Sequence, residues 1–332
     1  MHHPAPRDAS AQPPPAGDGT LRSAAEAWAL MLALARRRRK HGLPDRAAAF
    51  RLDGDAALEV AHRGELCAAS WNPDAGWSVP GAHAAPVGAM LELYLPVCSA
   101  RAGRPVVVAH LGQSIDGRIA TDSGDSHFVT GEANRRHLHR MRALCDAVIV
   151  GAGTIAADDP QLTTRQVPGD DPVRVVLDPN CRVAAAAGVL HDRRAPTLLA
   201  VGAARLAEAR HGAGAAEIIG VACDGGALDL RALLAALHAR GLHALFVEGG
   251  GVTVSQFLAV GLVDILQIAI APVFIGAGRP GLQLPPVPSM RDCLRPPGRV
   301  FRMGEDVLWS FDLRAPPAGA RPAAPPDLER IA

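Results

Sequence analysis

The chain has 332 residues, with 34 basic and 33 acidic side chains and a formal net charge of +1. This near-balance argues against a nucleic-acid or membrane-surface protein, because both classes rely on a basic excess. Apolar residues make up 48% of the sequence but aromatic residues only 4%, so the core must be built from Ala, Val, Leu and Ile. The six scattered cysteines contain no C-x-x-C pair, so neither a disulfide framework nor a zinc knuckle is expected. We expect a globular, cytoplasmic protein.

The two ends of the chain are rich in proline. Residues 1–20 and 314–332 are expected to be disordered, because they cannot bury enough apolar surface to offset the entropy of ordering. Between Ala24 and Ala35 lies an apolar helical run that ends in the basic residues 36–40. It is shorter than the roughly 20 residues of a membrane span. We predict a surface or interface helix whose basic last turn favours its own dipole, with a partner-docking basic patch as the alternative.

The pattern of the sequence changes near residue 100. Residues 21–100 contain no recognisable motif and are treated as an N-terminal extension, whereas residues 105–313 alternate predicted strands and helices. Such alternation predicts an α/β domain with a central, largely parallel sheet. The expected helices cover residues 131–144, 228–240 and 252–261, and the expected strands are Val106–Ala109, Ala147–Val150, Val173–Leu177, Thr197–Val201, Ala244–Val247 and Ile265–Ile275.

A first glycine turn, at residues 151–156, follows a predicted strand and matches the dinucleotide fingerprint G-x-G-x-x-A. Asp178 ends a later strand, where a ribose-binding acid is found in Rossmann domains. However, Pro160 stops the helix after about two turns, and Asp178 follows later than the usual spacing of about 20 residues. Three interpretations stay open: a Rossmann unit, a turn without a ligand, and a phosphate-approaching turn of another fold.

A second glycine turn, Glu248 to Gly251, joins a predicted strand to a predicted helix. Consecutive glycines permit close backbone approach, and the helix N-terminus offers unpaired N–H groups, so a pyrophosphate is the natural ligand. Thr253 and Ser255 add hydroxyl donors. Glu248 would repel an anion, so we expect it to bind N–H or hydroxyl groups of a substrate. The alternative is an ordinary turn with a solvent-facing glutamate.

Basic side chains share one face of the predicted helix 131–144. Arg135, His139 and Arg142 are spaced to lie together, either as a solvated face or as an anion contact, and Arg165 is a second candidate for a phosphate contact. His137 and His139 point to different faces of the helix, so no metal is expected.

Four segments in this order resemble one family: residues 106–120 (V-x-A-x-x-x-x-S-I-D-G-R-I-A from Val107), 124–130 (G-D-S-x-F-V-T), 150–165 (V-G-A-G-T-I-A-A-D-D-P-x-L-T-x-R) and 247–251 (V-E-G-G-G). The family is the reductase domain of bacterial riboflavin-biosynthesis deaminase/reductase proteins, which are relatives of dihydrofolate reductase. The resemblance covers residues 105–313. It implies a dihydrofolate-reductase-like mixed, mostly parallel sheet with flanking helices, the use of NADPH, and a homodimer. The zinc signature of the family's deaminase half is absent.

The resemblance also assigns site residues. Asp158 is implied to donate a proton or stabilise an imine, and Glu248 is implied to hold polar groups of the substrate. Many members have Lys where this chain has His110, and Ser where it has Pro179. The implied substrate contacts are Ser126, Arg142, Leu162, Arg165 and Glu248. The implied cofactor contacts are Gly112, Phe128, Thr154, Asp158, Pro179, Gly250, Gly251, Val252, Thr253, Val254, Ser255 and Gln256.

The resemblance predicts a function. The protein is expected to reduce the ribose of 5-amino-6-(5-phosphoribosylamino)uracil, or of its diaminopyrimidine counterpart, to a ribityl chain with NADPH. Its partners would be this small molecule and a second copy of the chain, with no nucleic acid and no membrane. Two alternatives stay open: a reductase of another pterin- or pyrimidine-type substrate in a secondary pathway, and a non-catalytic NADP-binding protein.

Overall fold

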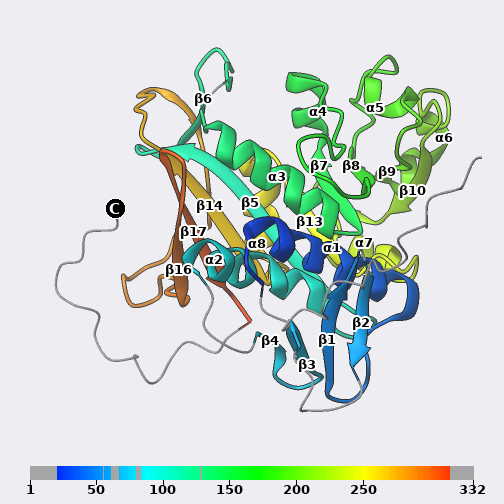
Figure 1. Ribbon diagram of the computed structural model, residues 1–332. Helices are drawn as coiled ribbons and strands as arrows, with labels where there is room; N and C mark the ends of the chain where they lie inside the picture. Colours follow the sequence, from blue (N-terminus) through cyan, green and yellow to red (C-terminus); the bar gives the residue numbers. More distant parts are fainter. Residues whose placement is uncertain (1–20, 55, 61–66, 80–83, 128, 315–332) are drawn as a thin grey trace, which may run out of the picture.

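The computed structural model describes residues 21–54, 56–60, 67–79, 84–127 and 129–314; apart from Arg314, the two tails expected to be disordered lie outside these ranges. A nine-stranded sheet runs through the centre of the molecule (Figure 1) in the order β10-β9-β8-β7-β13-β5-β14-β17-β16. Neighbouring strands from β10 to β14 are parallel, and the last two pairs are antiparallel. The predicted mixed, mostly parallel sheet is therefore confirmed. Its strands are β5 (Val106–Ser114), β7 (Ala147–Gly151), β8 (Val173–Leu177), β9 (Thr197–Gly202), β10 (Glu217–Val221), β13 (Ala244–Glu248), β14 (Ile265–Ala271), β16 (Gly298–Met303) and β17 (Asp306–Asp312).

All six strands expected from the sequence are present, and two of them differ in length by more than one residue. The strand β14 ends at Ala271 because Pro272 follows, and proline has no N–H to donate to a ladder. The strand β5 continues past the predicted Ala109 to Ser114, paired throughout with β14. Its second half carries His110 and other polar side chains to the carboxyl edge of the sheet.

Helices cover both faces of the sheet. In β5, Val106 and Val108 pack with Met141 in one hydrophobic cluster, whereas Val107 and Ala109 belong to a second cluster on the opposite face. This alternation is expected for a strand that is buried on both sides. The three predicted helices lie within two residues of their expected ends: α3 (Glu132–Leu144) on the first face, and α7 (Leu230–His238) and α8 (Gly251–Ala259) on the second.

Shorter elements complete the domain. The strands β6 and β15 pair with each other outside the large sheet, as do β11 and β12. None of the helices in the described part of the chain is both long and apolar enough to span a membrane. The short elements are α4 (Ala152–Asp158), α5 (Gly188–His191), η2 (Ala203–Arg205), α6 (Leu206–Ala209), β6 (Arg118–Thr121), β15 (Gly278–Pro280), β11 (Cys223–Asp224) and β12 (Ala227–Leu228).

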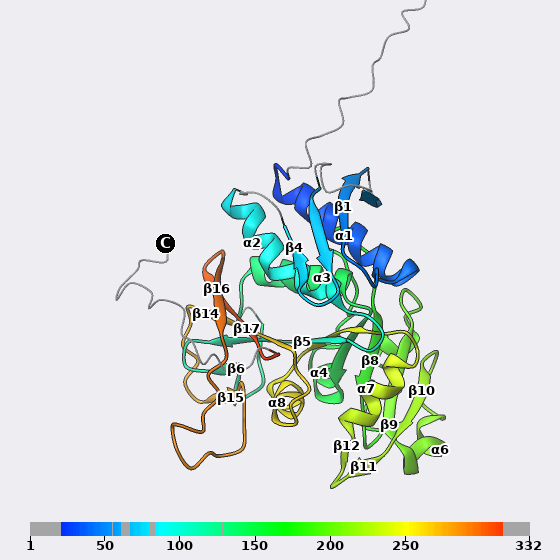
Figure 2. The same cartoon turned by 90° about the horizontal axis from the view of Figure 1, so that it is seen from below.

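The N-terminal extension lies on the first face of the sheet, against α3 (Figure 2). Its buried residues, which include Trp28 and Tyr94, belong to the same hydrophobic cluster as Met141 of α3 and Phe246 of β13. The extension and the predicted reductase domain therefore share one core. The extension consists of α1 (Ala24–His41), α2 (Ala85–Tyr94), η1 (Leu95–Ser99) and a four-stranded antiparallel sheet of β1 (Ala48–Asp53), β2 (Ala56–Val60), β3 (Ala69–Asn72) and β4 (Gly76–Ser78).

The basic end of α1 has partners within the chain that the sequence did not reveal. Arg38 is only 5% exposed, and its guanidinium donates to both carboxylate oxygens of Asp146 at 2.8 and 2.6 Å. Arg39 donates to Asp146 and to the carbonyls of Ala143 and Cys145, at the C-terminus of α3. Arg38 and Arg39 therefore bind the end of a neighbouring helix, so α1 is an interface helix within the chain, and these two side chains do not form a patch for an outside partner. Although burial opposes it, the Arg38 pair lowers the pKa of Asp146 to about 2.

Candidate active site

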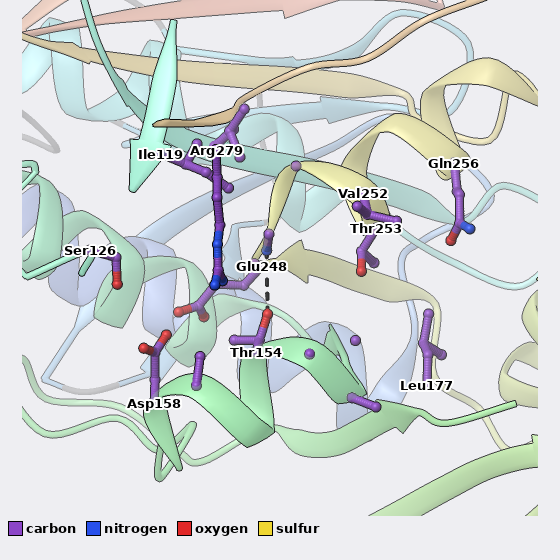
Figure 3. Close-up of a pocket in the computed structure, with 18 of the residues that line it drawn as sticks. Ile119, Ser126, Thr154, Asp158, Leu177, Glu248, Val252, Thr253, Gln256 and Arg279 are labelled. Atoms are coloured by element: carbon purple, nitrogen blue, oxygen red, sulfur yellow. Dashed lines mark hydrogen bonds between the residues drawn. The ribbon is translucent and has the colours of Figure 1, made fainter. Parts of the chain in front are cut away.

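The two glycine turns that compete in the sequence border one cavity. The strands β7 and β13 are parallel neighbours, so their carboxyl ends, at Gly151 and Glu248, lie at the same edge of the sheet. This edge opens into a cavity of about 970 Å³ (Figure 3). Most of the predicted site residues line it: Gly112, Ser126, Thr154, Asp158, Leu162, Pro179, Glu248, Gly250, Gly251, Val252, Thr253 and Gln256.

The two turns interlock through their glycines. A Cβ at Gly151 would lie 2.6 Å from the hydroxyl of Thr253, which real Cβ atoms do not approach. In return, the hydroxyl of Thr154 accepts from the Gly250 N–H at 3.4 Å and lies beside Gly249, whose φ is +144°. Glycine is thus required on both sides of the contact, and this part of the cavity wall is backbone.

The N-terminus of α8 is open to the cavity. Its N-cap, Gly250, has no side chain to satisfy the first N–H groups of the helix. A Cβ at Gly250 would meet nothing closer than Thr154 at 3.7 Å, whereas a Cβ at Gly251 would lie 1.9 Å from the carbonyl oxygen of Gly281. Gly251 is therefore needed for packing, and Gly250 leaves room for a ligand. The free N–H groups and the helix dipole favour an anion.

Two members of the predicted pyrophosphate loop do not border the cavity. Val254 is completely buried in the hydrophobic cluster beneath α8. The Ser255 hydroxyl accepts a hydrogen bond from the Gln283 N–H at 2.8 Å. Both residues lie on the inner side of the helix, so their part in the site is to hold α8 in place.

The Rossmann interpretation of the first glycine turn is wrong. The helix after it, α4, ends at Asp158, and Asp159 takes a left-handed backbone conformation with φ of 37°. The buried Asp178 carboxylate accepts from the N–H groups of Arg182 and Val183 at 2.8 and 2.7 Å. It stabilises its own loop instead of holding a ribose. The turn therefore belongs to another fold.

Glu248 forms a bidentate ion pair with Arg142. The Arg142 guanidinium donates to both oxygens of the carboxylate, one at 2.8 Å, and to the carbonyl of Thr163 at 3.0 Å. The Arg142 and Glu248 side chains are 8% and 13% exposed. The positive partner explains how an acid can stand beside an anion site. Arg142, predicted to contact the substrate, does not border the cavity and instead orients Glu248.

Polar side chains gather at the Glu248 end of the cavity. Figure 3 shows Ser126, Asp158 and Arg279 directed toward this end. Asp158 is exposed and has no hydrogen bond or ion pair with any described residue. Leu162, with φ of 55°, is buried in the wall. This end therefore combines free carboxylate, hydroxyl and guanidinium groups.

The free arginines of the cavity differ from the predicted ones. Arg165 does not border the cavity, and its guanidinium donates to the Thr163 hydroxyl at 2.8 Å. Arg135 and Arg279 do line it, and their guanidinium groups have no partner among the described residues. The sequence indicated Arg135 only as part of a basic helix face. It gave no signal for Arg279, because the β6–β15 pairing that brings it here is apparent only in three dimensions.

His110 lines the cavity as a neutral side chain. It lies opposite Glu248 in the β5–β13 register and is only 3% exposed. Burial lowers the pKa of His110 to about 4. Its Nε2 lies 3.0 Å from the Oδ1 of Asn134, whose Nδ2 donates to the Thr130 hydroxyl. Because Oδ1 only accepts, Nε2 carries the proton and Nδ1 remains an acceptor.

The other two histidines of the site region point to different faces of α3, as predicted. His137 is completely buried and bonds to Tyr94 and Gln267. His139 accepts from the Arg165 N–H at 3.1 Å. Burial lowers the pKa of both rings, that of His139 to about 4. Within the described ranges, no three His, Cys, Asp or Glu side chains are placed to hold a metal. Phe128, a predicted cofactor contact, lies outside the described residues.

Known proteins resemble this chain in both sequence and fold. A reductase from Methanothermobacter thermautotrophicus, named for 2,5-diamino-6-ribosylamino-4(3H)-pyrimidinone 5′-phosphate, is 37% identical over 222 residues, which are 64% of this chain and 99% of the relative. The reductase of the same name from Archaeoglobus fulgidus is 39% identical over 184 residues, covering 52% of this chain and 83% of the relative.

Solved structures agree with these relatives. A deaminase/5-amino-6-(5-phosphoribosylamino)uracil reductase from Thermotoga maritima superposes with a TM-score of 0.52 at 25% identity, over 68% of this chain but only 61% of the other. RibD from Acinetobacter baumannii superposes with a TM-score of 0.59 over 87% of this chain and 99% of the other; at 20% identity it supports the fold alone. The RibD C-terminal domain family matches residues 105–295, more than half of the chain. The reductase family predicted from the sequence is thus confirmed, and the chain belongs to the RibD C-terminal domain family.

Proposed function

We propose that the protein is an NADPH-dependent reductase of riboflavin biosynthesis that converts the ribose of a phosphoribosylamino-pyrimidine to a ribityl chain. The observation that carries this proposal is that one cavity is bordered by the open N-terminus of α8, the free carboxylate of Asp158 and the paired carboxylate of Glu248. An anion site beside two substrate-facing acids suits a phosphate-containing cofactor and a polar substrate. The names of the relatives support the same reaction.

The residues present fit NADPH. The uncapped N–H groups of α8 and the open space at Gly250 would hold the pyrophosphate, with Thr253 and Gln256 beside it. Gly112, Thr154 and Asp158 would surround the nicotinamide end, and the segment at Pro179 the other end. The bound cofactor supplies a hydride to C1 of the ribose in its ring-opened imine form.

The protein's own groups would bind and polarise the substrate. As a carboxylate, Asp158 would stabilise the positive charge of the protonated imine at the carbon that is reduced. Glu248, held in one orientation by Arg142, would accept hydrogen bonds from the pyrimidine or the sugar, and Ser126 would contribute a hydroxyl. The unpaired Arg279 and Arg135 would bind the ribose phosphate.

His110 favours the diaminopyrimidine among the two predicted substrates. A lysine at this position can only donate, which suits a ring carbonyl, whereas neutral His110 presents the Nδ1 lone pair. An acceptor suits an exocyclic amino group. We therefore assign 2,5-diamino-6-ribosylamino-4(3H)-pyrimidinone 5′-phosphate as the substrate and expect the deaminated uracil to be used less efficiently.

The test is NADPH oxidation with the diaminopyrimidine, with its deaminated counterpart and with dihydropterin or other pyrimidine substrates. Turnover of the diaminopyrimidine at least about tenfold more efficient than that of the uracil is expected, a difference of about 1.4 kcal/mol. If the protein binds NADPH but oxidises it with neither the diaminopyrimidine nor the uracil, the assignment is contradicted. The alternative of a reductase that acts on another substrate would then be favoured. Absence of NADPH binding would favour a non-catalytic protein.

We also propose that the protein is a homodimer. Light scattering in solution measures its oligomeric state.

A further inference from the structure

Through Tyr94, the N-terminal extension contacts a residue that packs behind the wall of the cavity. Tyr94 ends α2, is 1% exposed, and its hydroxyl lies 2.8 Å from Nδ1 of His137. On the other side of the ring, Nε2 lies 2.9 Å from Oε1 of Gln267 on β14. An amide oxygen only accepts, so Nε2 of the neutral ring carries the proton and Nδ1 accepts from the Tyr94 hydroxyl. A tyrosine of the extension therefore holds His137 in one tautomer and one orientation.

His137 stands directly behind the wall of the cavity. Its ring centroid is 5.3 Å from that of His110, which lines the cavity. One turn earlier on the same helix, Asn134 accepts from Nε2 of His110 at 3.0 Å. The ring of His110 is thus placed by two residues of α3, one through a hydrogen bond and one through packing. A rotation or shift of α3 would move both.

The extension holds α3 at two separated points. Tyr94 acts near the middle of the helix, while Arg38 and Arg39 bind Asp146 and three carbonyls at its C-terminus. Buried charge-assisted hydrogen bonds of this kind are strongly directional. They attach the C-terminal end of α3 to the extension, and the same helix carries Asn134 and Arg135 in the cavity wall.

We propose that Tyr94 is a positioning residue for the substrate end of the cavity, and that the N-terminal extension thereby takes part in substrate binding without touching the substrate. The proposal rests on the proposed function for its kinetic consequences, but the link from Tyr94 to His110 is a property of the protein alone. The two can therefore be tested separately.

The test variant is Tyr94→Phe, which removes only the hydroxyl. The ring packing against Trp28 and the contact of the ring with Arg140 are retained. We expect the imidazole ¹⁵N and ¹H signals of both His137 and His110 to shift in the full-length protein. The KM for the diaminopyrimidine should rise about 5- to 20-fold, whereas kcat should change less than about threefold and NADPH affinity, measured by fluorescence titration, less than about twofold.

The matched control is Trp28→Phe. Trp28 also belongs to the extension and packs on Tyr94, but its Nε1 donates to the carbonyl of Pro168 and has no bond to His137. This variant should lower thermal stability while leaving the imidazole signals of His110 and the KM unchanged. Combining Tyr94→Phe with His110→Asn should raise KM by less than the product of the single effects, because both act on the same contact.

The outcomes separate the two proposals. A folded Tyr94→Phe protein with unchanged His110 signals would overturn the positioning role, whatever the substrate. An equal rise of KM in Trp28→Phe would also overturn it, because a general loosening of the extension would then suffice. If the wild-type protein reduces no pyrimidine, the proposed function fails, and the imidazole signals still decide whether Tyr94 places His110.

Discussion

The two ends of the cavity differ in whether backbone or side chains form their walls. The end proposed for the cofactor is mostly backbone: two glycine turns interlock through Thr154 and Thr253, and α8 presents an uncapped N-terminus. The end proposed for the substrate is made of side chains whose positions depend on partners elsewhere, such as Glu248 on Arg142 and His110 on Asn134. The first end is thus specified by local sequence, and the second by tertiary pairing.

This difference has a consequence for mutation. At the backbone end, a substitution acts by adding atoms where a ligand or another backbone must approach. At the side-chain end, a substitution acts by leaving a buried partner unpaired, which costs stability as well as function. Substitutions at the two ends should therefore differ in whether they lower stability or only ligand affinity.

The largest effect is expected for Arg142→Ala, which leaves the Glu248 carboxylate without its partner. Breaking a buried pair of this kind typically lowers the free energy of unfolding by about 3–5 kcal/mol. Urea unfolding measures it, and Arg142→Met combined with Glu248→Gln should recover part of the loss, because no charge is then left unpaired. If Arg142→Ala weakened substrate binding at unchanged stability, Arg142 would be a substrate ligand and the contrast would fail.

Acid should destabilise the side-chain end first. Because the folded-state pKa of His110 lies near 4, below the ordinary value of 6.5, the unfolded chain binds the proton more readily. The stability from this group is complete above pH 6.5 and is lost as the pH falls toward 4, by roughly 3 kcal/mol. His137 acts in the same direction, whereas Asp146 loses its contribution only below about pH 4. Urea unfolding between pH 7 and 4.5 measures the effect. His110→Asn is the control, and its free energy of unfolding should depend less steeply on pH.

The phosphate contact is expected at the free arginines. Losing a charge-assisted contact typically costs about 1.5–3 kcal/mol, so Arg279→Ala should lower kcat/KM about 10- to 100-fold for a phosphorylated substrate and little for a dephosphorylated one. Arg165→Ala is the matched comparison, because its guanidinium bonds to Thr163 outside the cavity. If Arg165→Ala gave the phosphate-dependent loss instead, the contact predicted from the sequence would hold and Arg279 would be excluded.

The smallest effect is expected at the backbone end, for Gly250→Val. Its Cβ meets no protein atom closer than 3.7 Å, so the fold should survive. NADPH affinity should fall at least about tenfold, or about 1.4 kcal/mol, because the side chain enters the space above the α8 N-terminus. Gly251→Ala should instead unfold the region, since its Cβ would collide with Gly281. If the folded Gly250→Val protein bound NADPH with unchanged affinity, the proposed placement of the pyrophosphate at this turn would be contradicted.

The sequence predicted the secondary-structure elements and many of the residues that line the cavity, but it did not predict which charged side chains pair with one another. The glycine turns, the predicted helices and strands, and Asp158, Ser126 and Glu248 could be read from local patterns and from the family resemblance, and they border one cavity. The sequence placed Arg38 at the end of a surface or interface helix and Arg142 at the substrate, because nothing local reveals that Asp146 and Glu248 stand opposite them. Periodicity identifies a helix face but not what it faces.

The hydrogen bonds of Arg38 and Arg39 to the end of α3 also have a consequence for how the protein unfolds. Removing α1 would expose a carboxylate with a strongly lowered pKa and three helix-end carbonyls, and would cut through a hydrophobic cluster that runs from Leu21 to Leu308. Extension and domain should therefore melt in one cooperative transition, and the amides of α1 and α3 should exchange with solvent at similar rates. We therefore expect the unit of folding in this chain to extend beyond residues 105–295, which the family matches.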